Sequence, residues 1–129
     1  MEMEYSVEPH RKILKTGFCF GFLYYILDLG WNPTAYIKLP DGMEITDADV
    51  CVHGGITFKS DYLEISDNTF IDGNFIGWDY AHAGDYLGIF KSFSFDCSSA
   101  KKWTTKEIFK DVKEVCYQLC LIQQKNTQN

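Results

Sequence analysis

Two kinds of hydrophobic spacing divide the chain. Up to about residue 95, apolar and polar positions alternate in short runs separated by turn-forming residues, which is typical of β-strands. Towards the C-terminus, apolar residues recur three or four positions apart and define one amphipathic stripe, formed by Ile108, Val112, Val115, Leu119 and Ile122. The pattern therefore predicts an α+β fold, in which one C-terminal amphipathic helix packs on a mostly antiparallel β-sheet.

The strands are expected where aromatic and branched residues lie between glycine-rich or polar turns. The expected ranges are 12–20, 22–29, 34–39, 49–58, 62–65, 69–78 and 86–95. We expect the strand over 49–58 to be interrupted at Gly54-Gly55, and 62–65 to form a hairpin with 69–78.

The start of the helix is marked by two local signals. Thr104 and Glu107 have the spacing of a capping box, in which each side chain bonds the other residue's backbone N–H. Trp103, just before the cap, can pack on Ile108 as a hydrophobic staple. Polar residues from Gln123 onward predict a frayed end.

Length and charge limit the class of protein. The 129 residues, of which 46% are hydrophobic, suit a single domain over 1–129, with 1–10 and 123–129 as flexible ends. The formal net charge of -6 argues against a protein that binds a nucleic-acid duplex through its phosphates, because that requires a dense basic surface. A single anionic group could still be held by backbone N–H groups.

The five cysteines contain no C-x-x-C pair, so neither a zinc knuckle nor a closed disulfide framework is indicated. The apolar stretch 18–27 is interrupted by Gly21 and is shorter than the roughly 18 residues that a membrane-spanning helix needs, so we interpret it as buried strand. The acidic N-terminus is unlike a signal peptide. We expect a cytoplasmic protein that binds no membrane and carries no cofactor.

Two polar clusters flanked by glycine stand out in this aromatic chain, at 52–58 and 77–85. Glycine lets a ligand approach the backbone closely, while histidine, aspartate and tryptophan supply proton transfer, hydrogen bonds and a stacking face. We therefore predict a ligand site formed by His53, Gly54, Gly55, Thr57, Trp78, Asp79, Tyr80, His82 and Asp85.

The first cluster has two interpretations. Gly54 and Gly55 could expose consecutive backbone N–H groups as an anion nest, to which the imidazole of His53 adds a hydrogen bond or a charge. Alternatively, the glycines form a bulge in a central strand and His53 is a partly buried structural residue.

In the second cluster, Asp79, His82 and Asp85 are three residues apart and could join His53 around Zn, Mn or Fe. No strong metal-binding spacing is present, and we expect no resident metal. Asp79 could instead cap a turn. The rings of Trp78 and Tyr80 are the best candidates to face a planar ligand, although rings in such an aromatic chain also fill cores.

Together these strings resemble a family of small uncharacterised proteins encoded by phages and prophages. The likeness spans most of residues 17–121. It rests on Gly30-Trp31-Asn32-Pro33, the string from Val52 to Phe58, the string from Gly77 to Asp85, and Lys102-Trp103-Thr104. This chain has Phe75 where those proteins carry a tryptophan. The resemblance implies a setting in the cytoplasm of a bacterial host rather than an activity.

Three functions are compatible with these patterns. We favour a non-enzymatic protein that sequesters a small anionic or nucleotide-like molecule, such as a host immune signal, and forms a homo-oligomer. The second is a phosphoester hydrolase that uses His53, Asp79, His82 and Asp85. The third is an acidic protein that blocks a host protein's basic surface.

Overall fold

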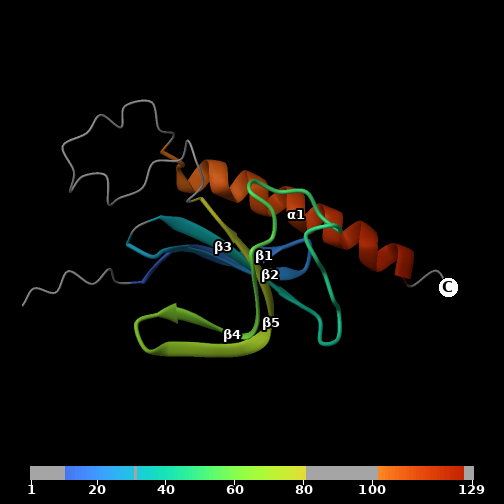
Figure 1. Ribbon diagram of the computed structural model, residues 1–129, viewed down its shortest axis with the longest axis horizontal. Coiled ribbons are helices and arrows are strands. Elements are labelled where there is room, and N and C mark those ends of the chain that lie inside the picture. Colours follow the sequence, from blue (N-terminus) through green and yellow to red (C-terminus); the bar gives the residue numbers. More distant parts are fainter. Residues whose placement is uncertain (1–10, 31, 81–101, 127–129) are drawn as a thin grey trace, which may run out of the picture.

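The computed structural model describes residues 11–30, 32–80 and 102–126, and it confirms the predicted α+β class (Figure 1). Within these ranges, five strands precede one helix. The elements are β1 (Lys12–Cys19), β2 (Phe22–Asp28), β3 (Pro33–Leu39), β4 (Phe58–Ser66), β5 (Thr69–Asp79) and α1 (Thr105–Asn126).

The strands form one antiparallel sheet in the order β1-β2-β3-β5-β4. Neighbouring strands are mostly consecutive in the chain, and the exception is β5, which pairs with both β3 and β4. β5 therefore has a strand on each side from Phe75 to Gly77, and its last residues, Trp78 and Asp79, pair with β3 alone.

Each face of the sheet carries its own hydrophobic cluster, because side chains alternate between the faces of a strand. On one face, α1 packs against residues that include Ile26, Ile37 and Ile76. The other face carries a smaller cluster of Leu27, Tyr36, Leu63 and Phe75. In Figure 1, α1 lies along one side of the strands and the β4–β5 hairpin extends on the other.

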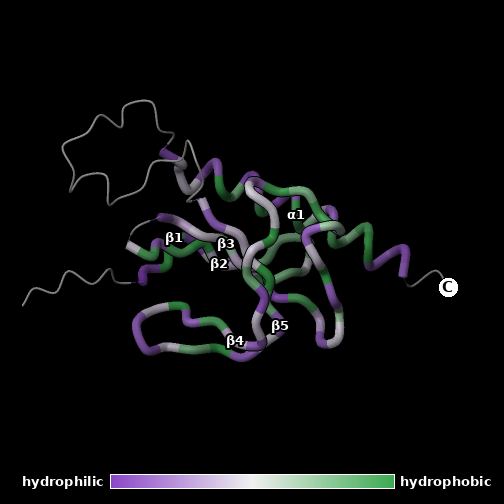
Figure 2. Tube along the Cα trace, viewed as in Figure 1, coloured by the Kyte–Doolittle hydropathy of each residue, from purple (hydrophilic) through white to green (hydrophobic). Residues whose placement is uncertain are grey.

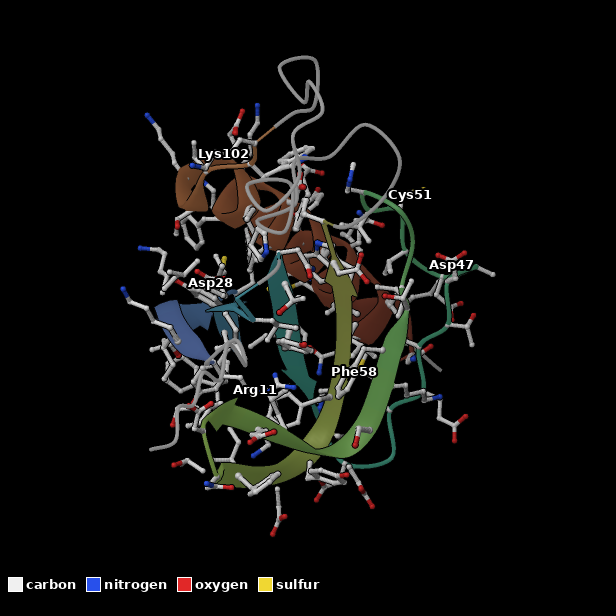
Figure 3. The ribbon with its side chains drawn as sticks, turned by 60° about the vertical axis from the view of Figure 1, so that its left-hand side comes forward. Arg11, Asp28, Asp47, Cys51, Phe58 and Lys102 are labelled. Carbon is white, nitrogen blue, oxygen red and sulfur yellow. The ribbon has the colours of Figure 1, made fainter. Side chains whose placement is uncertain are left out.

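The β4–β5 hairpin bends back towards β1. The pairing of β5 with β4 shifts by one residue near Gly73, which has a φ of 154°, so a bulge bends the long strand there. Figure 3 shows the end of β4 close to Arg11. Arg11 Nε lies 3.2 Å from Glu64 Oε1, and the backbone N–H of Arg11 donates to Asp67 Oδ1 at 3.0 Å.

The predicted start of α1 is confirmed. Glu107 N–H donates to Thr104 Oγ1 at 3.2 Å, and Thr104 N–H donates to Glu107 Oε1 at 3.0 Å, which is the reciprocal pattern of a capping box. Figure 2 shows α1 alternating between hydrophobic and hydrophilic residues. Residues 123–126, which the sequence predicted to fray, belong to the helix.

The strand predicted over 49–58 is wrong. Residues 40–57, here called the 40–57 loop, cross the α1 side of the sheet, and β4 begins at Phe58. The side chain of Gln118 on α1 bonds both backbone groups of Cys51, at 2.8 and 3.0 Å. Ile45 and Val50 are buried in the helix-side cluster. The apolar residues whose alternation predicted a strand therefore anchor a loop to the helix-side cluster.

Two further strand predictions have different outcomes. The apolar stretch 18–27 is not one buried strand, because the β1–β2 turn lies within it and Phe18 is 75% exposed. The strand predicted over 86–95 lies outside the described residues. Among the helices that the structure describes, none is long and apolar enough to cross a membrane.

Gly77 provides a test of this packing. A Cβ at Gly77 would lie 2.8 Å from Ala35 O and would overlap the ring of Tyr36, so Gly77→Ala should lower the free energy of unfolding by about 1–3 kcal/mol. Gly17→Ala is the matched control, because a Cβ added at Gly17 would lie 3.4 Å from Tyr24 Oη, an ordinary van der Waals contact. Urea unfolding measures both variants, and equal stability of the two would contradict this packing.

Candidate functional site

Three strings that are far apart in the sequence meet at one place. The ring of His53 stacks on Tyr80, with centroids 5.0 Å apart and planes 8° apart. Trp103 lies against both rings, with centroids 4.7 Å from His53 and 4.8 Å from Tyr80. This ring cluster of His53, Tyr80 and Trp103 joins the 40–57 loop, the residue after β5 and the segment before α1. Figure 3 shows the labelled neighbours Cys51 and Lys102 at the same end of the molecule.

Trp78 and Tyr80 point into the helix-side core. Trp78 is 1% exposed and Tyr80 is 0% exposed. The indole N–H of Trp78 donates to the Tyr80 hydroxyl at 2.9 Å, and that hydroxyl donates to Asp111 Oδ2 on α1 at 2.6 Å. The sequence predicted that these rings would face a ligand, whereas the structure buries both and uses their polar atoms to join β5 to α1.

The Gly54-Gly55 turn lies against a carboxylate of the protein itself, that of Asp47. Both glycines have positive φ, 71° and 81°, and Gly55 N–H donates to Val52 O at 2.9 Å, so this N–H is used within the turn. Ile56 N–H donates to Asp47 Oδ1 at 2.9 Å, and a Cβ at Gly55 would overlap the Asp47 carboxylate. An external anion at this turn would therefore compete with Asp47.

A hollow of about 260 Å³ lies beside the ends of β3 and β5, and we call it the Asp79 hollow. Its apolar border consists of Leu29, Tyr36 and Phe58. Trp78 also borders the hollow, but its indole packs in the helix-side core. Its polar border consists of Asn32, Thr34, Thr57 and Asp79. Thr57 and Asp79 belong to the predicted site, and Thr57 Oγ1 lies 3.4 Å from Asp79 Oδ2.

Strand register brings these residues together. Thr34 pairs with Asp79, and Tyr36 pairs with Gly77, which also pairs with Phe58 across β5. Directly opposed residues share one face of a sheet, so Thr34, Tyr36 and Asp79 lie on the face away from α1. Because Gly77 has no side chain, the ring of Tyr36 can lie across β5 and meet Phe58 edge to face at 5.0 Å.

Thr34 is the polar residue that ordinary packing does not explain. It is 4% exposed, and among the described residues its Oγ1 is a buried side-chain oxygen with no hydrogen-bond partner. Leaving a buried hydroxyl unsatisfied costs about 1–3 kcal/mol. The sequence analysis did not single out Thr34, although a threonine among the apolar residues of a strand expected in the sheet was a signal for it.

The hydrolase hypothesis depends partly on residues that are not described. His82 and Asp85 lie outside the described residues. Within the part of the chain that the structure describes, no three His, Cys, Asp or Glu side chains are grouped so that they could hold a metal ion. His53 and Asp79 occupy different places, since His53 stacks in the ring cluster and Asp79 borders the hollow on the opposite face.

No protein-family model matches the chain, and no solved structure matches it.

The hydroxyl of Tyr80 gives a test of the join between β5 and α1. Tyr80→Phe leaves the Trp78 N–H and one Asp111 oxygen without their bond, so the free energy of unfolding should fall by about 1–3 kcal/mol. Tyr62→Phe on β4 is the control, because Tyr62 is 51% exposed. Chemical denaturation compares the variants, and a stable Tyr80→Phe protein would argue against a structural role for this hydroxyl.

The described cysteines differ in reactivity. Burial, and secondly the neighbouring Cys19, raise the pKa of Cys116 to about 12, so its thiolate is scarce near neutrality. Cys51 is exposed. Iodoacetamide should modify Cys51 in the folded protein and Cys116 after unfolding in urea, as peptide mass spectrometry would measure. Equal rates in the folded protein would contradict the burial of Cys116.

Proposed function

We propose that this protein is a non-enzymatic binding protein that encloses part of a small, nucleotide-like molecule in the Asp79 hollow. The observation that carries this proposal is the Thr34 hydroxyl, which is buried at the hollow without a partner. Native proteins pair the large majority of their buried polar groups, so an unpaired one in a residue that borders a hollow supports a binding site at that place.

The border of the hollow suits a ring-shaped ligand. Aromatic side chains at Tyr36 and Phe58 provide apolar walls, and the polar groups of Thr34, Thr57 and Asp79 lie together on one side. A few polar groups among apolar walls are the usual composition of a small-molecule site. Binding requires no catalytic group, and this proposal includes no turnover.

The resemblance to small phage-encoded proteins supports a setting for this activity. In that setting the protein would act inside a bacterial host and sequester a signal of the host's defence. Sequestration depends on slow release of the ligand rather than on its conversion.

The test is capture of an unchanged ligand. Protein purified from a bacterial lysate is washed and heated, and the released small molecules are identified by mass spectrometry before and after prolonged incubation. We expect a ring-containing compound, released intact. A chemically altered product would favour the hydrolase, and release of no compound by the wild-type protein would contradict the proposal.

A pair of variants tests whether the ligand occupies the hollow. Thr57 borders the hollow and is exposed, so Thr57→Phe should place a ring there and reduce the captured ligand at least tenfold without loss of folding. Thr69→Phe makes the same change at an exposed position in the β4–β5 hairpin and should capture as much as the wild type. Equal capture by both variants would locate the ligand elsewhere.

A further inference from the structure

We propose that a row of lysines on α1 and β1 is a docking surface for an acidic segment of another protein. The row, here called the lysine ridge, consists of Lys15 on β1 and of Lys106, Lys110 and Lys113 on α1. The ridge lies on the α1 side of the sheet, whereas the Asp79 hollow lies on the other face. Binding at the ridge therefore does not depend on a ligand in the hollow.

Helical spacing and one shared ring bring the four ammonium groups together. Lys106, Lys110 and Lys113 are four and three residues apart, so they follow one flank of α1 over about 10 Å. Nζ of Lys113 lies 5.4 Å from the centroid of the Phe109 ring, and Nζ of Lys15 lies 4.8 Å from the same centroid. These two nitrogens are therefore at most about 10 Å apart, the sum of those distances. Figure 3 shows nitrogen-tipped side chains extending from the start of α1 and from β1.

The lysine ridge has no counter-charge within the part of the chain that the structure describes. Its four lysines are exposed, and none forms an ion pair with a described carboxylate. Glu114 follows Lys110 by four residues, a spacing that permits an ion pair on a helix, but the two are not paired. Asp111 of the same helix accepts the Tyr80 hydroxyl instead. The ridge is therefore a local positive surface that attracts carboxylates, although the chain has a formal net charge of -6.

Exposed aromatic rings continue the ridge towards the β1–β2 turn. Tyr117 follows Lys113 by four residues, and its ring centroid lies 5.8 Å from that of Phe20. Both rings are exposed, and Phe20 has a φ of 52°, a left-handed backbone conformation that is strained for a phenylalanine. Protein interfaces combine buried aromatic rings with charged groups at the rim. A segment that carries apolar side chains beside its carboxylates would cover the rings and pair with the lysines.

The charges favour a protein segment over a nucleic acid. Taking the four lysines of the ridge away from a net charge of -6 leaves a formal charge of -10 for the rest of the chain. A polyphosphate long enough to pass beyond the ridge would be repelled by that charge, whereas a short acidic segment contacts the ridge alone. The ridge also contains no arginine, the residue whose planar fork matches phosphate oxygens.

The experiment uses a synthetic peptide as the probe. A fluorescein-labelled peptide that repeats Glu-Glu-Leu-Phe is titrated with the wild-type protein at low and high NaCl concentration, and fluorescence anisotropy measures binding. A peptide with Gln in place of Glu, and a labelled oligothymidylate of the same length, are titrated in parallel. We expect the acidic peptide to bind at low salt about tenfold more tightly than either comparison probe, and more weakly at high salt.

Three results of this titration would overturn the proposal. They are no binding of the acidic peptide at low salt, equal binding of the Gln peptide, and tighter binding of oligothymidylate. The last result would identify a single-stranded nucleic acid as the partner of the ridge.

Matched double variants locate the contact. Lys110→Gln with Lys113→Gln should weaken binding of the acidic peptide about tenfold or more, because it removes two charges from the ridge. Lys59→Gln with Lys125→Gln removes the same net charge at exposed positions of β4 and α1, and should bind within about twofold of the wild type. Equal losses in the two double variants would show an effect of net charge alone and would overturn the assignment to the ridge.

A further double variant separates binding from folding. Lys106→Gln with Lys110→Gln keeps the contact of Lys113 with Phe109, so it tests the ridge even if that contact is needed for stability. We expect a Tm equal to that of the wild type and a loss of peptide affinity of about tenfold. Wild-type affinity in this folded variant would contradict the proposal.

Discussion

The hydrogen-bonded chain from Trp78 through Tyr80 to Asp111 determines how the rest of the molecule is arranged. It ties the end of β5 to α1 with two hydrogen bonds, a buried one of 2.9 Å and a partly buried one of 2.6 Å. Since side chains alternate along a strand, turning Trp78 and Tyr80 towards the helix places Gly77 and Asp79 on the other face. The Asp79 hollow therefore exists because the helix holds the residues on either side of Asp79.

The 40–57 loop depends on the same arrangement. Gln118 of α1 holds Cys51, and Asn74 of β5 donates its side-chain N–H groups to Pro40 O and Met43 O, at 3.0 and 2.7 Å. The loop is thus fastened to both layers before it reaches β4. Its Gly54-Gly55 turn is stabilised from within by Asp47. In this structure the turn positions His53 against Tyr80 and delivers Thr57 to the hollow.

Residues close in sequence predicted the helix, whereas the candidate site depends on the pairing of strands that are far apart in the sequence. The capping box at Thr104 and the helical stripe depend on residues close in sequence, so the pattern of α1 was readable. The alternation over 49–58 was misleading, because burial of Ile45 and Val50 against α1 requires only suitable spacing along a loop. The unpaired state of Thr34 depends on the register of β3 with β5, which no single segment encodes.

The two faces of the sheet contribute differently to the stability of the fold. The helix-side face joins α1 to the strands through aliphatic burial and the Trp78–Tyr80–Asp111 chain. Features that reduce stability gather on the opposite face, where Thr34 lacks a partner and Gly77 contributes no side chain to pack. With total stabilities of about 5–15 kcal/mol for native proteins, such losses are affordable only where another part of the fold compensates for them. Separating the two faces lets the helix-side core supply stability while the other face keeps an open, polar hollow.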